Sequence, residues 1–303
     1  MRLQRLERIV AASRAHAGPL AIDLALRLTL LDLLLRPVGN WVLRPVFLAI
    51  AAIALIRPAW LRHPLPWFAL AAMAGARVLL DWPLADNHAY LLGYWCLAAA
   101  LALSTGIPDR VLAVNGRLLI GLVFLFACIW KFTGTGQYAD GTFFQVTFLT
   151  DPRFEGFSRV AGGLDGDTYN ELREFVKQHN DAATMQPRYP VEIPDRFRML
   201  AIAATVWNLF INAAMAIAFL WPGGKRLAPI RHILLLTYCT ITYAIATVDG
   251  FGWLLLAMGA AQCTLAEKRT RFAYVLVFIA IIFYREIPWS DEVFLPLLQG
   301  AAG

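Results

Sequence analysis

The chain has 303 residues, of which 59% are hydrophobic and 16% are charged, and its formal net charge is +6. A soluble domain carries about a quarter charged residues, so the composition excludes an ordinary soluble protein and indicates an integral membrane protein. The basic residues stand in short gaps between apolar runs, which is typical of membrane topology rather than of a nucleic-acid-binding groove. We therefore expect membrane lipids around the chain and no nucleic-acid partner.

Apolar runs that approach the length needed to cross a bilayer recur along the chain. They predict an all-α polytopic transmembrane helix bundle of about eight or nine membrane segments. The predicted segments lie near residues 18–36, 41–56, 65–82, 88–105, 117–132, 199–221, 228–247, 250–266 and 272–285. They divide the chain into N-terminal membrane helices in 1–144, an extracytoplasmic insert in 145–198, and C-terminal membrane helices in 199–303.

The charges in the gaps between these segments predict the orientation. With the N-terminus in the cytoplasm every inner gap is basic, for example around Arg57 and around Lys225, whereas the short outer gaps hold mainly acids such as Asp86 and Asp249. This distribution follows the positive-inside rule. It predicts a multi-pass protein of the plasma membrane, the inner membrane of a bacterium, with a cytoplasmic N-terminus.

The longest polar piece, about 133–198, is expected outside the cell. Thr168 followed by Glu171 is typical of a capping box at a helix start. Apolar side chains recur on one face of the helix that follows: Tyr169, Leu172, Phe175 and Val176. Three prolines between 187 and 194 favour extended chain. We expect a short amphipathic helix and a proline-rich strap over the outer mouth of the bundle, and a loosely ordered connector is the alternative.

Ionisable and strongly polar side chains inside membrane segments are costly and usually face the interior of a bundle. Three pairs have the i,i+4 spacing that places both members on one helix face: Asp23 with Arg27, Arg77 with Asp81, and Asn208 with Asn212. Each of the first two pairs is either a neutralised pair that joins helices or an ion pair that lines a polar cavity.

The predicted topology brings several polar side chains to the outer membrane face: Arg77, Asp81, His88, Lys131, Tyr138 and Asp140. Lys131 follows Trp130 at a segment end, so it is either an interfacial anchor or a base, because a lysine partly shielded from water would act as a base near neutral pH. His88 is either a hydrogen-bonded polar tip at a helix start or a group that stabilises a developing oxyanion. No metal-ligand spacing is present, so we expect no metal.

Two stretches resemble the vitamin K-dependent γ-carboxylase-like family, whose membrane region is called the HTTM domain (horizontally transferred transmembrane helices). The stretch DNHAYLLGYWCLAAALAL, residues 86–103, resembles the Asn-His-x-Tyr-Leu segment of the family. The stretch NGRLLIGLVFLFACIWKFTGTGQYADGTFF, residues 115–144, resembles the family helix that ends in a lysine and is followed by an aromatic-x-x-Gly loop. Asn208 and Asn212 stand where the family has an acidic residue.

The resemblance implies a quinol-dependent, carboxylase-like (lyase or oxygenase-type) membrane enzyme that acts on a secreted peptide or protein. Lys131 would be the base that deprotonates a reduced, vitamin K-like quinone at the extracytoplasmic face, and His88 would assist it. The cofactor-binding residues in this hypothesis are Arg77, Asp81, Tyr138 and Asp140.

Two other functions stay open. A non-catalytic membrane factor for the maturation of, or immunity to, a secreted peptide would use residues 145–198 for recognition. A transporter would line its pathway with the pair Arg77 and Asp81.

Overall fold

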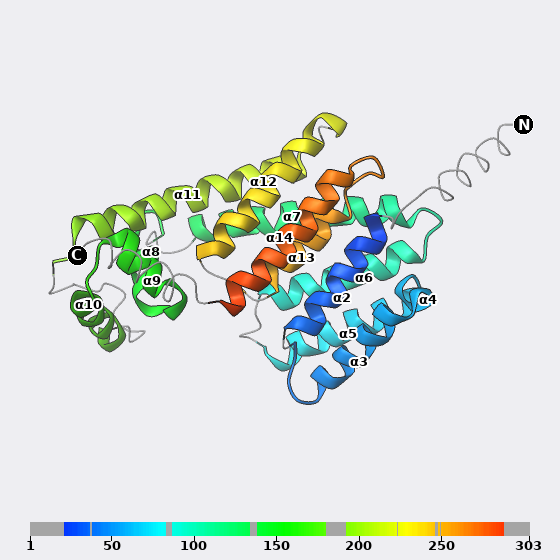
Figure 1. Ribbon diagram of the computed structural model, residues 1–303, viewed down its shortest axis with the longest axis horizontal. Coiled ribbons are helices and arrows are strands. Elements are labelled where there is room, and N and C mark those ends of the chain that lie inside the picture. Colours follow the sequence, from blue (N-terminus) through cyan, green and yellow to red (C-terminus); the bar gives the residue numbers. More distant parts are fainter. Residues whose placement is uncertain are drawn as a thin grey trace, which may run out of the picture. The chain divides into compact units, whose positions relative to one another are not determined.

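The computed structural model describes residues 21–36, 38–82, 87–133, 138–179, 192–222, 224–245, 248 and 250–287, and within these ranges the chain is helical and contains no strand (Figure 1). These residues form thirteen α-helices, α2 to α14, and one short 3-10 helix, η1. The all-α class predicted from the sequence is therefore confirmed for the described part of the chain.

The chain divides into two compact units, which consist of residues 1–120 with 249–278 and of residues 121–248 with 279–303. The first unit contains α2 (Ala21–Leu35), α3 (Leu43–Ile56), α4 (Pro58–Leu61), α5 (Pro64–Leu80), α6 (Asn87–Leu103) and α13 (Phe251–Ala260). The second unit contains α8 (Thr142–Thr150), η1 (Pro152–Phe154), α9 (Glu155–Gly162), α10 (Gly166–His179), α11 (Asp195–Leu220) and α12 (Gly224–Ile245). Helices α7 (Pro108–Thr133) and α14 (Lys268–Glu286) contribute residues to both units.

The core of the first unit is formed around α2 and α13. Helix α13 is apolar on every side and is buried from residue 252 to residue 260, as expected for a central helix. Trp95 of α6 donates a hydrogen bond of 2.8 Å from its indole nitrogen to Thr29 of α2, which satisfies a buried polar group. At Gly116 a Cβ would lie 2.9 Å from the carbonyl oxygen of Met258, so the absence of a side chain allows α7 to approach α13 closely.

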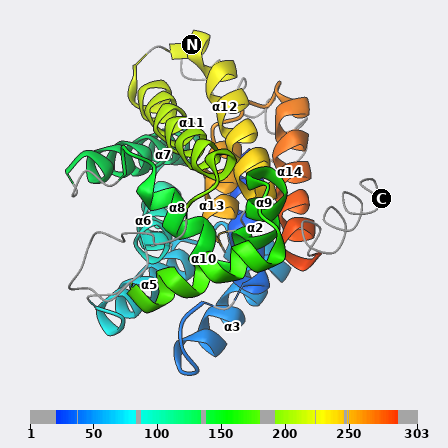
Figure 2. The ribbon, with the colours of Figure 1, turned by 90° about the vertical axis from the view of Figure 1, so that its left-hand side faces the viewer.

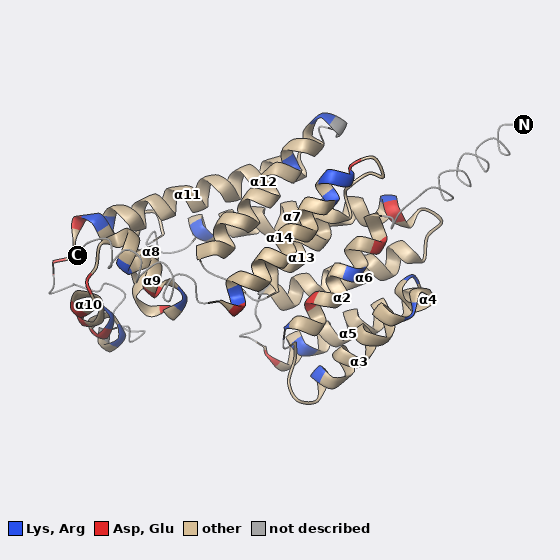
Figure 3. Ribbon diagram, in the orientation of Figure 1, with Lys and Arg blue, Asp and Glu red and all other residues tan. Residues whose placement is uncertain are grey.

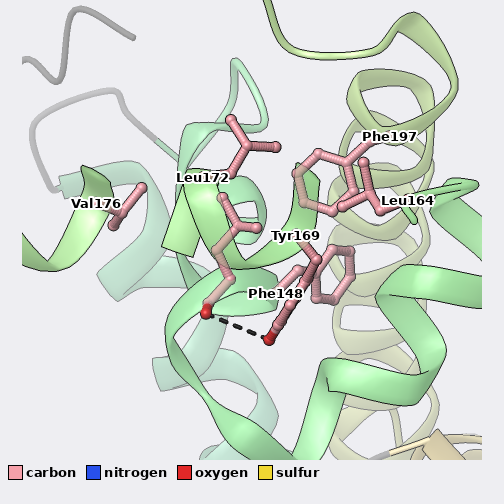
Figure 4. Close-up of a cluster of buried hydrophobic side chains, with 7 residues drawn as sticks. Phe148, Leu164, Tyr169, Leu172, Val176 and Phe197 are labelled. Carbon is pink, nitrogen blue, oxygen red and sulfur yellow. Dashed lines mark hydrogen bonds between the residues drawn. The ribbon is translucent and has the colours of Figure 1, made fainter. Parts of the chain in front are cut away.

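The extracytoplasmic insert predicted from the sequence contains ordered helices. Helix α8 contacts both α10 and α11, and α9 contacts α8 and α11 (Figure 2). Seven buried apolar side chains fill the space between these helices: Phe148, Leu149, Leu164, Tyr169, Leu172, Val176 and Phe197 (Figure 4). Each fully buried leucine or phenylalanine contributes about 1.5–3 kcal/mol to stability. We call these seven residues the insert core, and their packing rules out the loosely ordered connector for residues 138–179.

The predicted amphipathic helix is present as α10, but its cap is not the expected one. Helix α10 begins at Gly166, and the carboxylate of Asp165 accepts hydrogen bonds from the backbone nitrogen of Thr168 at 2.8 Å and from its hydroxyl at 2.9 Å. The N-cap is therefore Asp165 and not Thr168, because aspartate just before the first turn satisfies the same free N–H group. Helices α8 and α9 were not predicted, and most of the proline-rich strap lies outside the described residues.

Two helices in the described part of the chain, α7 and α11, are long and apolar enough to cross a membrane. Only 28% of the apolar window of α7 and 33% of that of α11 is buried, whereas a core helix of a soluble protein would be mostly buried. Charged side chains of α11 are confined to its first turn (Figure 3). The exposed apolar residues on the rest of α11 recur at intervals suited to one lipid-facing stripe: Met199, Ile202, Val206, Phe210 and Ile217.

Helix ends in the second unit are closed by arginine side chains from neighbouring helices. The guanidinium of Arg231 in α12 donates hydrogen bonds of 2.7 Å and 2.8 Å to the carbonyl oxygens of Ala218 and Trp221 at the end of α11. A cation near a helix C-terminus also complements the helix dipole. Helix α7 packs closely on the same end of α11, because a Cβ at Gly121 would lie 2.7 Å from the side chain of Leu220.

Candidate functional site

Lys131 lies in the last turn of α7, where its ammonium group meets polar side chains from the following loop and from α11. Its Nζ donates a hydrogen bond to Oδ1 of Asn208 and lies 5.1 Å from the centroid of the Tyr138 ring. The Tyr138 hydroxyl donates to the same oxygen at 2.7 Å, and the Asn212 side-chain nitrogen donates to it at 2.8 Å. We call these four residues the Lys131 cluster.

Local structure explains how the four residues meet. Asn208 and Asn212 are one helical turn apart in the uncharged part of α11, so both amides lie on one face. Tyr138 belongs to the turn that ends at Gly141, whose φ of 86° is readily adopted only by glycine. Asp140 accepts a hydrogen bond of 2.9 Å from the backbone nitrogen of Thr142, and so it caps the first turn of α8.

The oxygen of Asn208 accepts more hydrogen bonds than an amide usually does. A side-chain carbonyl oxygen has two lone pairs, whereas three donors converge on Asn208 Oδ1. The hydrogen bond with Asn212 also fixes the orientation of the Asn208 amide, with its oxygen towards Lys131 and Tyr138. The donors of Lys131 and Tyr138 therefore compete for one acceptor, and either of them would be better satisfied by an additional oxygen.

The electrostatic setting of the cluster is a single cation among neutral groups. Among the residues that the structure describes, no carboxylate lies within ion-pair distance of the Lys131 ammonium. Burial raises the pKa of the Tyr138 phenol, so this hydroxyl stays protonated and remains a donor at neutral pH. The Tyr138 ring packs on Phe143, with ring centroids 5.0 Å apart. The cluster therefore offers one positive charge and one neutral donor beside aromatic surface.

Large apolar side chains next to the cluster in sequence are exposed. Trp130 is 80% exposed and Phe132 is 73% exposed on either side of Lys131. Trp207 and Phe210 are likewise exposed on α11, near Asn208. In a chain whose α7 and α11 are apolar and long enough to cross a membrane, exposed side chains of this kind are expected to meet lipid.

His88, the other predicted catalytic residue, belongs to the first unit, whereas Lys131 belongs to the second. It lies in the first turn of α6, and its ring packs on the ring of Phe251 at the start of α13, with centroids 4.8 Å apart. The contacts described for His88 and for Lys131 each involve residues of their own unit.

Of the predicted cofactor-binding residues, Tyr138 joins Lys131 and Asp140 caps α8. Arg77 and Asp81 form the expected ion pair at 3.3 Å at the end of α5, and both side chains are accessible to solvent. A surface pair of this kind contributes about 0–1 kcal/mol. Within the described residues, no group of three or more His, Cys, Asp or Glu side chains is arranged to hold a metal ion.

The first unit contains a buried ion pair that the sequence analysis did not identify. Asp32 of α2 and Arg36, which follows the end of α2, are 0% and 5% exposed, and the two groups are 2.8 Å apart. Their i,i+4 spacing was the available signal. The expected pairing of Asp23 with Arg27 is wrong, because Asp23 binds the guanidinium of Arg62 in a bidentate manner at 2.7 Å and 2.8 Å.

Asn208 and Asn212 were recognised as a pair but not as the partners of Lys131. Two amides one turn apart in the uncharged part of a helix were the signal for a polar site. What the sequence did not reveal is the contact that brings the end of α7 to that point of α11.

A scan against protein-family models finds none that matches this chain, and searches of curated proteins and of solved structures find no significant match.

Proposed function

We propose that this chain is a polytopic enzyme of a bacterial inner membrane in which Lys131 acts as a base on a lipid-soluble hydroquinone at the extracytoplasmic face. The observation that carries the proposal is the bond between the Lys131 ammonium and the neutral oxygen of Asn208. A base must spend part of its time uncharged, and a carboxylate partner would hold lysine in its charged form. A neutral partner fits a lysine that releases and accepts a proton.

Several features support a membrane chain with more than the two long apolar helices. Helices α3, α5, α6 and α13 are also apolar, although each has only 10–17 residues. Short apolar helices cross a membrane where the bilayer thins or where they lie against longer neighbours. With α7 and α11 they make six apolar helices in the described part of the chain, and together with the basic gaps of the sequence they support a polytopic chain with a cytoplasmic N-terminus.

The residues of the Lys131 cluster fit a hydroquinone. When bound, the hydroquinone would supply a weakly acidic hydroxyl group. Neutral Lys131 would accept the proton of that hydroxyl, and the Tyr138 hydroxyl would donate a hydrogen bond to the oxygen left negative. The rings of Tyr138 and Phe143 offer aromatic surface for a flat ring.

Replacement of Lys131 tests this proposal. A positioned general base contributes about 100-fold to 10,000-fold to a rate, so we expect both Lys131→Ala and Lys131→Arg to lose at least about 100-fold of the activity. The measurement is hydroquinone-dependent proton release and oxidation in membranes that contain equal amounts of each variant. Lys177→Ala, at an exposed lysine of α10, is the matched control. Full activity in both Lys131 variants would rule out the proposal.

A second function, a membrane factor that recognises a secreted peptide, is favoured by the insert core. The packing of α8, α10 and α11 around the insert core would provide a stable recognition element. For this function Leu172→Ala should abolish the biological effect, because it removes a fully buried side chain of the insert core. Lys131→Ala should leave the effect almost unchanged. The opposite order of effects supports the enzyme.

A further inference from the structure

The Lys131 ammonium has no counter-charge in the described part of the chain, although its surroundings are largely apolar. Its partners are an amide oxygen and the face of an aromatic ring. A charge in an apolar or membrane setting is costly unless it is paired. Asn208, which stands nearest to the ammonium, is an amide and so cannot provide the negative charge. A negative group from outside the chain would complete the site.

The donors of the cluster indicate the shape of that group. Lys131 and Tyr138 both direct a donor at Asn208 Oδ1, which also accepts from Asn212. Because a carbonyl oxygen has two lone pairs, a ligand with two oxygens would relieve this crowding. One oxygen would accept from Lys131 and the other from Tyr138, while Asn212 would keep its bond to Asn208. The single positive charge matches a single negative charge shared by the two oxygens.

The apolar side chains around the cluster indicate what is attached to the negative group. Trp130 and Phe132 flank Lys131 in the sequence of α7, Trp207 precedes Asn208 in α11, and all three side chains are exposed. A small anion from water would leave these surfaces uncovered. A molecule with a hydrocarbon tail would bury them and gain about 25 cal/mol for each Å² of apolar area removed from water.

We propose that the Lys131 cluster binds the monoanionic head of a membrane amphiphile, a chemistry that a fatty carboxylate and a phospholipid phosphodiester share. The inference rests on the proposed function only in that Lys131 is the working group of the site. A bound anion holds the lysine in its charged form, so the lysine cannot take up a proton from a hydroquinone. The anionic amphiphile therefore inhibits the enzyme.

Equilibrium binding to the purified full chain in a neutral detergent tests the inference. The ligands are radiolabelled oleate and radiolabelled phosphatidylglycerol, with oleyl alcohol as the uncharged control and acetate as the control without a tail. We expect one molecule of an anionic amphiphile to bind per chain, and both controls to bind at least tenfold more weakly. The anion that binds more tightly identifies the source of the head group.

Variants then assign the binding to the cluster. Lys131→Gln and Asn208→Asp should each lower the affinity at least tenfold, the first by removing the cation and the second by placing a carboxylate of the chain beside it. Tyr138→Phe removes one donor, keeps the ring and should lower the affinity about threefold to tenfold. Lys177→Gln removes an exposed lysine charge in the same unit and should leave the affinity unchanged. The melting temperature of each variant verifies that it is folded.

The inference is overturned if neither anion binds, if oleyl alcohol binds as tightly as oleate, or if folded Lys131→Gln and Asn208→Asp retain full affinity. Binding is measured without turnover, so the two proposals fail separately. Tight anion binding by a protein that shows no hydroquinone-dependent activity rejects the enzyme alone. Activity that depends on Lys131, without any effect of the anions, rejects this inference alone.

Discussion

Each of the two units contains a charged side chain in an apolar setting, and the two charges have partners of different kinds. In the first unit Arg36 is almost fully buried and is paired with the carboxylate of Asp32. In the second unit Lys131 is partly exposed and binds the neutral oxygen of Asn208. The first charge is neutralised inside the chain, as expected for a group that holds helices together. The second has no carboxylate partner among the described residues, which is the contrast on which the proposed role of Lys131 rests.

The comparison predicts the largest loss of stability at Asp32. Asp32→Ala should lower the free energy of unfolding by about 3–5 kcal/mol, because it leaves the guanidinium of Arg36 buried without its carboxylate. Reversible unfolding by sodium dodecyl sulfate in detergent micelles measures this loss. The double variant Asp32→Leu with Arg36→Leu should recover much of the stability. Equal loss in the single and double variants would mean that packing, and not charge, matters at this position.

A smaller loss is expected at Gly250, which precedes α13 and packs against the other side of Arg36. Its φ is 81°, and a Cβ there would lie 2.2 Å from the guanidinium carbon of Arg36. Gly250→Ala should therefore lower the free energy of unfolding by about 1–3 kcal/mol, measured in the same way. Gly75 is helical and has open space around it, so Gly75→Ala should instead stabilise by about 0.5–1 kcal/mol. Similar outcomes at the two glycines would argue against a tight contact at Gly250.

Lys131 should behave in the opposite way to Asp32. Lys131→Met removes the charge but leaves Asn208 Oδ1 with two hydrogen-bond donors, Tyr138 and Asn212. Its free energy of unfolding should stay within about 1 kcal/mol of that of the natural protein, whereas activity and anion binding are lost. A loss of stability as large as that of Asp32→Ala would make Lys131 a structural residue and remove the contrast between the units.

The smallest effect is expected from Asp165, the N-cap of α10. Hydrogen bonds from the backbone nitrogen and the hydroxyl of Thr168 lower the pKa of this carboxylate in the folded protein. Its stabilising contribution is therefore complete above the ordinary carboxyl pKa and is lost as the pH falls through the lowered value. Circular dichroism of α10 between pH 6 and pH 2, in the natural protein and in Asp165→Asn, should show a weaker pH dependence in the variant. Identical profiles would remove Asp165 as the cap.

The positions of the apolar helices were predictable because long apolar runs specify helices almost regardless of their neighbours. Each of the nine predicted segments coincides with a helix, and the largest differences are the start of α7, at Pro108 rather than near residue 117, and the end of α13, at Ala260 rather than near residue 266. The first turn of α7 contains the charged residues Asp109 and Arg110, so the apolar run begins later than the helix itself. Helices α8 and α9 were missed because they have only 9 and 8 residues and owe their stability to the insert core.

The candidate site was only partly predictable, for a different physical reason. Lys131 and Tyr138 are close in sequence, and the type of residue and the segment end indicated them. The bond from Lys131 to Asn208 joins positions 77 residues apart. The periodicity of a single helix cannot predict such a contact. The same reason explains the wrong partner of Asp23, because a local i,i+4 rule names Arg27 while the fold brings Arg62 within reach.

Arg231 is one of the basic residues between the apolar runs, and it also has a structural role. Its guanidinium is bound to the carbonyl oxygens of Ala218 and Trp221 and is buried, so it is not available to lipid phosphates. In the predicted topology the start of α12 lies in the cytoplasm. Its cytoplasmic position would then depend on Lys225 and Arg226, which precede Arg231. Neutralising those two should favour inverted insertion, whereas Arg231→Gln should loosen the end of α11 in a correctly inserted chain.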